Sequence, residues 1–515
     1  MDTKALRQKI LDLAIRGKLV PQDPNDEPAS VLLERIRQQK QQMVKEGKLK
    51  PKDIKKDSVI FVGEDNLHYE KFSDGSVKCI EDEVPFGLPD GWAWVRLGNL
   101  SAAIQYGLSN SAEPQGTHRL LRITDIQDGK VDWNAVPFTT VNDPEAYLLK
   151  TGDIVFARTG ATVGKSFLIT ETPYPSVYAS YLIRIRLLGS LSPEYIYQFF
   201  DSACYWSQIT DKSVGVGQPN CNGTSLKELF IPLPPISEQL RIVPTAQALL
   251  AYVAKIDAEK KSLLSIIMAT KSKILDLAIR GQLIPQDPND EPASVLLERI
   301  RAEKEELIKQ GKIKRDKKES VIFRGEDNSY YEKIGDKVEN ISDEIPFELP
   351  DGWFFVRLKE LWELISGRDL SPSEYNADGV GIPYITGASN FVDGKVELAR
   401  WTTSPQVITE AGDLLLTCKG TIGGMAFNDF GNAHIARQIM AIRNTFALNL
   451  EYLALCMRFY INAIKDAAKG LIPGISREDI LNLILPVPSP NYQAKIVERV
   501  AEVTNILSAI EKSLN

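Results

Sequence analysis

Apolar residues between positions 239 and 280 recur at every third or fourth position, which is the spacing of a coiled-coil seam. At about 1.5 Å per residue, a helix of this length spans roughly 60 Å. That is too long for an element buried inside one compact domain. We therefore predict a spacer helix, whose seam residues are Ile242, Ala246, Leu249, Val253, Ile256, Leu263, Ile267, Ile274 and Leu277, with Lys260 and Thr270 as interruptions.

Both chain ends repeat this spacing. The C-terminal stretch matches the register of residues 242 to 260, with seam residues Ile496, Val500, Val503, Leu507, Ile510 and Leu514. At the N-terminus, Leu6, Ile10 and Leu13 match Thr270, Ile274 and Leu277. Each terminus thus corresponds to half of the central helix. We expect the two terminal helices to meet and to rebuild a second long helix, which would give an antiparallel pair with a pseudo-twofold axis.

The chain is internally duplicated. Residues 10–37 read ILDLAIRGKLVPQDPNDEPASVLLERIR, and residues 274–301 differ from them only at the counterparts of positions 18 and 20. Further along, DSVIFVGEDN at 57–66 recurs as ESVIFRGEDN at 319–328, and LPDGWAWVRL at 88–97 recurs as LPDGWFFVRL at 349–358. The chain therefore consists of two copies of one unit.

A charged segment follows each AIRG sequence. Gly17 and Gly281 fit the position just past a helix end, where a left-handed conformation favours glycine. After a proline-punctuated turn, charged helices are predicted over 29–45 and 293–309. Two interpretations remain open for these helices, a solvated helix packed on the spacer and a docking surface for a partner subunit. Lysine-rich stretches at 48–56 and 312–318 are predicted to be exposed linkers.

Two globular regions of mixed α and β character lie between the helices. Runs such as HRLLRI, DIVFARTG and YLIRIRLLG predict strands in the first, and IPYITG, DLLLTCKG and IMAIR predict strands in the second. Helices are predicted over 193–207 and 450–466. The predicted fold class is α+β, with two pseudo-twofold-related mixed α/β domains separated by a long antiparallel coiled coil. The predicted domains are 1–87 (N-terminal helix and arm), 88–236 (first module), 237–348 (central helix, arm helix and linker), 349–491 (second module) and 492–515 (C-terminal helix pairing with the central helix).

Composition is that of an ordinary globular protein, with 43% hydrophobic and 25% charged residues. There is neither a signal peptide nor a membrane-spanning stretch in the sequence, so a cytoplasmic location is expected. The formal charge of -7, from 61 basic and 68 acidic residues, does not by itself favour nucleic-acid binding. Three scattered histidines make a histidine-rich metal site unexpected, and no metal ligands are assigned.

No motif supports catalysis. TGATVGKS at 159–166 departs from a phosphate-binding loop because Gly160 and Gly164 enclose three residues instead of four, and KGTIGGMA in the second copy lacks the lysine. The Asn/Asp-Pro-Pro-Tyr/Phe tetrapeptide that is typical of adenine methyltransferases is absent. No serine or cysteine nucleophile is accompanied by a histidine base. Two interpretations of the glycine loops remain, a structural turn and a loop that offers Lys165 or Lys419 to a DNA backbone. The sequence therefore predicts a non-enzymatic protein.

The layout favours recognition. Two related but diverged modules at the ends of a spacer can each read a short sequence, with an unread gap between them. A second hypothesis is a non-enzymatic coiled-coil scaffold whose twin modules bind protein partners. The net negative charge of the chain would favour this second hypothesis.

The order of motifs resembles one family. LPDGW before an Arg-Leu pair, GDIVFARTGATVGK and GDLLLTCKGTIGG, and PLPPISEQLRIV leading into a long helix are similar to the DNA specificity subunit of type I restriction-modification systems. The resemblance covers essentially the whole chain, twice. The proline-containing segment that leads from the second module into the C-terminal helix departs from the pattern, with SPNYQ in place of PPISEQ.

The resemblance implies a subunit without catalytic activity or a cofactor of its own. Its two target recognition domains would bind an asymmetric bipartite sequence in double-stranded DNA. The coiled coil would carry two modification subunits, which bind S-adenosylmethionine and methylate adenine. Two restriction-translocase subunits, which use ATP and Mg, would complete a system for DNA methylation and phage defence.

Candidate DNA-contacting residues are polar positions in the turns and glycine loops of both modules. Capping, turn bonding and solvated charge remain structural alternatives for each. In the first module the candidates are Arg119, Arg122, Thr124, Gln127, Arg158, Lys165, Gln218, Asn220 and Asn222, and in the second they are Tyr384, Thr386, Ser389, Asn390, Lys419, Arg437 and Gln438.

Overall fold

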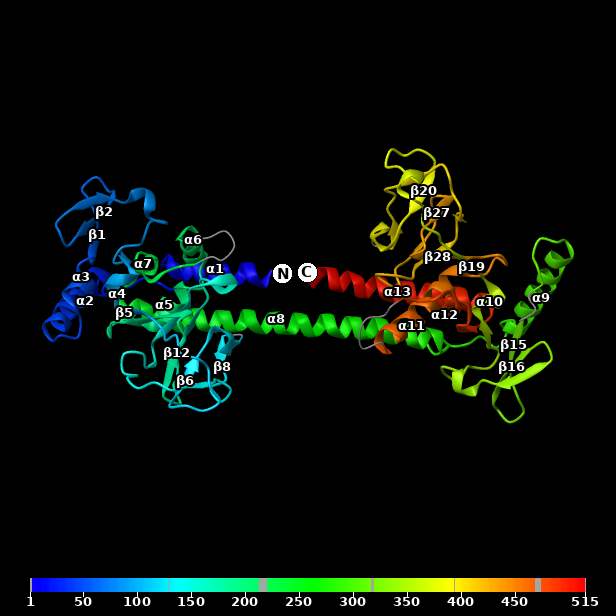
Figure 1. The fold of residues 1–515 in the computed structure, drawn as a ribbon, viewed down its shortest axis with the longest axis horizontal. Helices are drawn as coiled ribbons and strands as arrows, with labels where there is room; N and C mark the ends of the chain where they lie inside the picture. Colours follow the sequence, from blue (N-terminus) through cyan, green and yellow to red (C-terminus); the bar gives the residue numbers. More distant parts are fainter. Residues whose placement is uncertain are drawn as a thin grey trace. The chain divides into compact units, whose positions relative to one another are not determined.

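A computed structural model of the chain describes residues 2–127, 129–212, 220–315, 319–392, 394–467 and 474–514, with the backbone alone for 463–467. It divides into two compact units, Met1–Lys261 and Ser262–Asn515. Each unit combines an arm, which consists of helices and a small antiparallel sheet, with a mixed α/β module (Figure 1). This confirms the predicted fold class of two related mixed α/β modules.

The arm of the first unit precedes its module. It contains α1 (Thr3–Ile15), α2 (Ala29–Lys45), α3 (Pro51–Ile54) and an antiparallel sheet of β1 (Ser58–Val62), β2 (His68–Phe72) and β3 (Val77–Cys79). The charged helix predicted over 29–45 is confirmed with the same bounds, and its buried face includes Leu32 and Ile36. The predicted linker at 48–56 contains the short helix α3, which Pro51 begins at a position where a missing N–H costs no hydrogen bond.

The first module is built around a four-stranded antiparallel sheet of order β11-β10-β13-β5. A second sheet, of order β12-β6-β9, pairs β12 with β6 in parallel. The elements are β4 (Ala93–Arg96), α4 (Leu97–Leu100), β5 (Ser101–Tyr106), β6 (His118–Leu121), β7 (Ile126–Gln127), β8 (Lys130–Val131), β9 (Phe138–Thr139), β10 (Ile154–Ala157), β11 (Ser166–Leu168), β12 (Ser176–Tyr178), β13 (Leu182–Leu187), α5 (Pro193–Phe199), α6 (Ala203–Lys212), α7 (Gly223–Lys227) and β14 (Phe230–Leu233).

The helix predicted over 193–207 is divided into α5 and α6. The Ser202 hydroxyl accepts a hydrogen bond from the Tyr205 backbone N–H at 3.2 Å. A residue that caps a new helix forms this kind of bond. Phe199, Phe200 and Tyr205 pack together across the break, and all three are buried. The local capping bond and this aromatic cluster explain why one apolar pattern gives two helices.

The second unit repeats the arrangement. Its sheet of order β19-β28-β25-β26 corresponds to β5-β13-β10-β11 of the first unit. The elements are α9 (Ala293–Lys309), β15 (Ser320–Arg324), β16 (Tyr330–Ile334), β17 (Lys337–Asn340), β18 (Phe354–Arg357), α10 (Leu358–Leu361), β19 (Glu363–Ser366), β20 (Ile382–Ile385), β21 (Phe391–Val392), β22 (Lys395–Val396), β23 (Trp401–Thr402), β24 (Ile408–Thr409), β25 (Leu414–Thr417), β26 (Met425–Phe427), β27 (Ala433–Ile435), β28 (Ile439–Arg443), α11 (Leu450–Ala467), α12 (Arg477–Leu481), β29 (Ile484–Val487) and α13 (Pro490–Leu514).

The long helix α8 (Ile236–Ile279) contains the boundary between the two units. It begins at Ile236, three residues earlier than predicted. Pro244 lies inside the helix, although the apolar spacing gave no sign of a break there. In the first unit, α1 is joined to α8 by a hydrogen bond of 3.0 Å from the Thr3 hydroxyl to Asp257. In the second unit, Lys271 of α8 pairs with Glu511 of α13 at 2.6 Å.

Burial along the predicted seam is uneven. Buried seam residues are Ile242, Ala246, Val253, Ile267, Ile274, Ile496 and Val500, half-buried ones are Ile256, Leu277, Val503, Leu507 and Leu514, and exposed ones are Leu249, Leu263 and Ile510. The interruption at Thr270 has a local cause, since its hydroxyl donates to the Ile266 carbonyl at 2.8 Å. Such a bond to the preceding turn lets a polar side chain lie within a helix. Buried seam residues therefore concentrate toward the two modules, and the stretch near the unit boundary is more exposed.

The AIRG and LPDGW motifs pack against each other. Gly17 has φ of 65°, and a Cβ there would lie 2.5 Å from Pro89. Gly281 repeats this with φ of 67° and 2.7 Å to Pro350. These glycines end the helix in a left-handed conformation and leave room for the proline of the motif. Both motifs therefore serve to attach each arm to its module.

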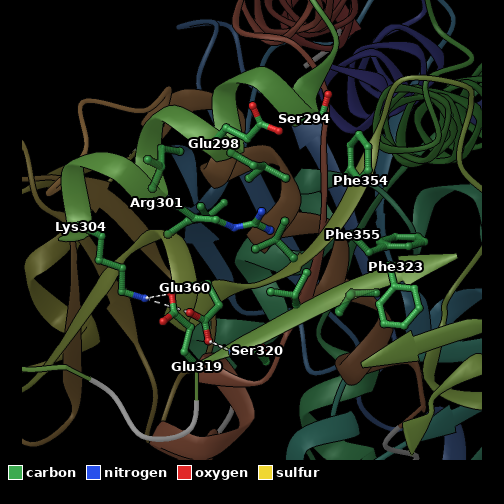
Figure 2. Close-up of a pocket in the computed structure, with 16 residues that line it drawn as sticks. Ser294, Glu298, Arg301, Lys304, Glu319, Ser320, Phe323, Phe354, Phe355 and Glu360 are labelled. Carbon is green, nitrogen blue, oxygen red and sulfur yellow. Dashed lines mark hydrogen bonds and ion pairs between the residues drawn. The ribbon is translucent and has the colours of Figure 1, made fainter. Parts of the chain in front are cut away.

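Buried ion pairs also join arm and module in each unit. Arg357 of β18 donates to Glu332 of β16 at 2.7 and 3.1 Å, and the pair Arg96–Glu70 repeats this in the first unit. In the second unit, Lys304 of α9 lies at one end of a cavity of about 210 Å³, between α9, β15 and β18. Figure 2 shows Lys304 facing Glu319 and Glu360. The Lys304 Nζ lies 3.1 Å from a carboxylate oxygen of Glu319 and 3.0 Å from one of Glu360.

No helix in the described ranges is long and apolar enough to cross a membrane.

Candidate nucleic-acid interface

Three separate segments of the first module meet at Arg158, which follows β10. The Arg158 backbone N–H donates to the Tyr181 carbonyl at 3.1 Å, ahead of β13. The Cys221 N–H donates to the Arg158 carbonyl at 3.0 Å, ahead of α7, and Thr159 forms a bridge with Asn220. The glycine loop, the start of β13 and the segment before α7 therefore form one site, here called the loop site.

The Arg158 side chain is held by an aromatic ring. Its guanidinium carbon lies 4.9 Å from the centroid of Tyr106. This is an attractive cation–π arrangement. The Tyr106 hydroxyl accepts a hydrogen bond from the Gly223 N–H at 2.9 Å, which fixes the ring. The buried Nε of Arg158 has no partner within the described part of the chain. A guanidinium positioned in this way can present its remaining donors to two acceptors at once.

The second module builds the same loop site with different residues. The Cys418 N–H donates to the Gln438 carbonyl at 2.8 Å, and the Ile475 N–H donates to the Cys418 carbonyl at 2.9 Å. These bonds place Cys418 where the first module has Arg158, and Gln438 where it has Tyr181. The strand pairing also puts Ser366 in the position of Tyr106. The two loop sites thus share a backbone and differ in chemistry.

Apart from the half-buried Arg158, the charged candidates of the loop sites are exposed. Lys165 and Lys419 both point to solvent from their glycine loops. Arg437 is paired with Asp369 at 2.7 Å, with its side chain 68% exposed. Gln438 lies against Gly387, where a Cβ would come within 2.5 Å of its side-chain oxygen. Exposed cations on loops are suited to phosphate contacts, which position a protein on DNA without reading bases.

The candidates around β6 are engaged within the module. The Arg119 guanidinium lies 3.9 Å from the Phe138 ring centroid and donates to the Val136 carbonyl at 2.5 Å. Arg122 pairs with Asp125 at 2.6 Å, and this hydrogen bond raises the pKa of Arg122. Thr124 and Gln127 are exposed, and the Gln127 amide donates to the Thr124 carbonyl at 2.7 Å. Of this group, Thr124 and Gln127 are exposed, and the ion-paired Arg122 keeps 41% of its side chain exposed, whereas Arg119 is held inside the module.

Their counterparts near β20 are also largely internal. Tyr384 is 5% exposed, and its hydroxyl accepts from the Leu370 N–H at 3.3 Å. Asn390 is equally buried, and its side-chain oxygen accepts hydrogen bonds from both the backbone N–H and the hydroxyl of Thr386. Ser389 is exposed. Tyr384, Thr386 and Asn390 therefore stabilise the turn through these internal hydrogen bonds. Ser389 is accessible to a ligand.

The late polar candidates divide in the same way. Asn222 caps α7, because its side-chain carbonyl accepts from the N–H groups of Thr224 and Ser225 at 2.9 Å. Asn220 is exposed beside the loop site. Gln218 lies outside the described residues.

Two aromatic residues of the first loop site were absent from the candidates. Tyr181 is 63% exposed and Tyr106 is 40% exposed. The signal was available for Tyr181, since it precedes a strand start, LIRI, that corresponds to IMAI after Gln438. Tyr106 gave no comparable signal, because it ends an apolar strand and resembles a core residue.

Nothing in the described residues points to covalent or metal chemistry. They contain no group of three or more His, Cys, Asp or Glu side chains placed to hold a metal ion. Burial raises the pKa of the Cys204 and Cys221 thiols to about 11, so both remain protonated near neutral pH. Such thiols are poor nucleophiles.

Comparison with known proteins agrees with a recognition role. A family model described as "Type I restriction modification DNA specificity domain" matches residues 89–266 and 350–515. The chain is 26% identical to the type I restriction enzyme EcoEI specificity subunit of Escherichia coli, across 99% of the chain and 90% of that protein. It is also 26% identical to the EcoAI specificity subunit of the same species, across 97% and 88%.

A solved structure shares the fold. A chain from a study of "complex assembly and conformational transition of the type I R-M system" aligns with a TM-score of 0.54 and 21% identity, covering 84% of this chain and 94% of that one. The family model matches more than half of the chain, and the relatives are specificity subunits. The chain therefore belongs to the family of type I restriction-modification DNA specificity subunits, which recognise a DNA sequence and do not catalyse a reaction.

Proposed function

We propose that the chain recognises an asymmetric bipartite DNA sequence, with each module reading one half. The observation that carries this proposal is the difference between the loop sites. At equivalent backbone positions the first module holds Arg158 and Tyr181, and the second holds Cys418, which is buried, and the exposed Gln438. Modules that share a scaffold and differ at these positions are suited to two different half-sites.

The side chains suit base and backbone contacts. An arginine held by an aromatic ring can donate two hydrogen bonds to one guanine, and a glutamine can pair with an adenine in the major groove. Lys165 and Lys419 would contact phosphates. The net charge of -7 opposes DNA binding at long range, so these local cations and the partner subunits would supply the attraction.

The proposal includes partner subunits and a spacer. Two modification subunits, which bind S-adenosylmethionine and methylate adenine, and two ATP- and Mg-dependent restriction-translocase subunits would assemble on the chain. The duplicated arms and helices would give the two modification subunits equivalent positions. The long helix, together with the terminal helices, would set the length of the unread gap. The proposed location is cytoplasmic, where the DNA is.

The test is a protection experiment on the chain assembled with its modification subunit. We expect a salt-sensitive footprint on duplex DNA with two protected segments and an unprotected gap. Absence of sequence preference at low salt would reject the proposal and favour the protein-binding scaffold.

A further inference from the structure

Each arm carries a small sheet with one solvent-facing surface of apolar residues. Directly paired residues of antiparallel strands lie on the same face. In the first unit the pairing aligns Val59, Lys71 and Val77 in one row, and Phe61, Tyr69 and Cys79 in the next. In the second unit the rows are Val321, Lys333 and Val338, then Phe323, Tyr331 and Asn340. We call these surfaces the arm faces.

The arm faces are nearly the same in chemistry. Five of the six positions hold the same residue type in both units, and only Cys79 and Asn340 differ. Positions elsewhere on these strands have changed, for example Val62 to Arg324 and Lys78 to Glu339. Burial does not explain the identity, because Phe61 and Phe323 are 41% and 39% exposed, and Val77 and Val338 are 54% and 50% exposed.

The aromatic pair of each face is held in a fixed position. Phe61 and Tyr69 stack with ring centroids 5.9 Å apart at 27°, and Phe323 and Tyr331 do so at 5.9 Å and 24°. The Tyr69 hydroxyl donates to Asp65 at 2.7 Å, and the Tyr331 hydroxyl donates to Asp327 at 2.9 Å.

The hairpin glycines leave room for these tyrosine rings. A Cβ at Gly63 or Gly325 would lie 2.8 Å from the tyrosine ring. The GEDN sequence of each hairpin therefore fixes a half-buried tyrosine ring against the exposed Phe61 or Phe323. Rings that are already fixed in this way lose little entropy on binding.

One lysine lies between the valines of each face. Lys71 is flanked by Val59 and Val77, and Lys333 by Val321 and Val338. Neither lysine has an ion-pair partner among the residues that the structure describes, although most nearby charges are paired. An unpaired ammonium surrounded by exposed apolar side chains is complementary to a carboxylate within an apolar surface. A phosphate backbone would instead call for several cations in a row.

We propose that the two arm faces bind the same protein segment twice, and that this segment belongs to the modification subunit and carries a carboxylate among apolar side chains. This inference rests on the proposed function, which requires two copies of that subunit. Surfaces that contact different DNA halves diverge, as the loop sites do, whereas surfaces that contact identical partners are expected to stay the same.

The second face adjoins a hollow. Val321 and Phe323 also line the cavity between α9 and β18, and Figure 2 shows Phe323 and Phe354 at the end away from Lys304. An apolar side chain of the bound segment can occupy this space, with the aromatic rings around it.

The experiment places a photoreactive benzoylphenylalanine at Phe61 and, in a separate chain, at Phe323. Each full-length chain is assembled with the modification subunit and irradiated. We expect both positions to cross-link to the same peptide of the modification subunit. The matched control carries the probe at Val62, which is 56% exposed and neighbours Phe61. Because successive residues of a strand face opposite sides of the sheet, this probe should give little cross-linking to that peptide.

A charge-reversal series supplies an independent measurement. Combining Lys71→Glu with Lys333→Glu should lower the affinity for the modification subunit at least about tenfold, as expected for loss of a charged contact at an interface. Lys78→Glu is the control, because the second copy already carries Glu339 at this position. It should bind as the unmodified chain does.

The outcomes separate the inference from the proposed function. If the unmodified chain binds two modification subunits, but the probes react with DNA, with different peptides or with nothing, the inference is overturned and the proposed function stands. If the unmodified chain binds no modification subunit, both are overturned.

Discussion

The arms and the recognition modules are both present twice in this chain, and the two pairs have diverged to very different extents. In the arms, residues 10–37 and 274–301 differ at two positions. In the modules, the same backbone bonds hold Arg158 in one copy and Cys418 in the other. This difference is expected if the two arms bind identical partners and each module recognises a different half of the DNA target, as proposed above.

The contacts that attach each arm to its module are also duplicated. The glycine at the helix end, the proline it faces and the buried arginine–glutamate pair occur in both units. One bond differs. Lys40 in the first arm pairs with Asp57, and burial lowers the pKa of Lys40. Burial also acts to lower the pKa of Lys304 in the second arm, but the carboxylates of Glu360 and Glu319 outweigh this effect and raise the pKa.

The largest effect is expected from Arg357→Met, which leaves the carboxylate of Glu332 buried without its partner. The pair is largely buried, and breaking such a pair costs about 3–5 kcal/mol of folding free energy. Calorimetric unfolding would measure this loss. Arg96→Met should give a similar loss in the first unit, and very different losses would contradict the equivalence of the arms.

A pH dependence follows from the same pair. Burial raises the pKa of Glu332, but the hydrogen bond and charge of Arg357 outweigh it, and the net pKa lies below its ordinary value. The stabilisation is therefore complete above the unfolded-state pKa of about 4.3, and is lost as pH falls through the lower folded-state pKa. The stability difference between the unmodified chain and Glu332→Gln should stay constant from about pH 7 to 5 and shrink below about pH 4.

Gly281→Ala is expected to cost about 2–4 kcal/mol of folding free energy, because a left-handed alanine is strained and its Cβ meets Pro350. Gly311→Ala is the matched control, with a φ of 70° and open space around it. It should cost only the conformational part, about 1–2 kcal/mol. Equal losses in thermal unfolding would show that the contact between the AIRG and LPDGW motifs is unimportant.

Sequence patterns were sufficient for the arms because their helices carry strong local signals. The bounds of α2 and α9 follow from a proline before an amphipathic run, and both match the predicted ranges. The candidate DNA-contacting residues of the modules were harder to predict from the sequence. Tyr384 and Asn390 are polar residues beside turns, as base-reading residues are, but the packing of distant strands buries them. Tyr106 could not be identified because it ends an apolar strand, and only its contact with Gly223, far away in the sequence, places it at the loop site.

Arg158→Ala tests the modules directly. We expect it to weaken binding to the cognate sequence by about 1–3 kcal/mol and to relax the preference at one base pair in one half-site. Competition binding with singly substituted DNA duplexes would measure this. An equal loss on all sequences would assign Arg158 to the backbone instead.

Lys165→Ala is expected to have the smallest effect. Because a phosphate contact carries no sequence information, affinity should fall to a similar extent on all DNA sequences. The slope of log affinity against log salt concentration should decrease by about 1. Affinities measured at several salt concentrations would show this, and an unchanged slope would remove Lys165 from the interface.

The most direct test of the central claim, that each module reads its own half, is genome-wide mapping of methylated adenines in cells that carry the modification subunit with the unmodified chain, with Arg158→Ala or with Gln438→Ala. The unmodified chain should give one motif of two specified halves and an unread gap, and each variant should relax a different half. If both variants altered the same half, or if either altered both, the separate assignment of the two modules would be contradicted.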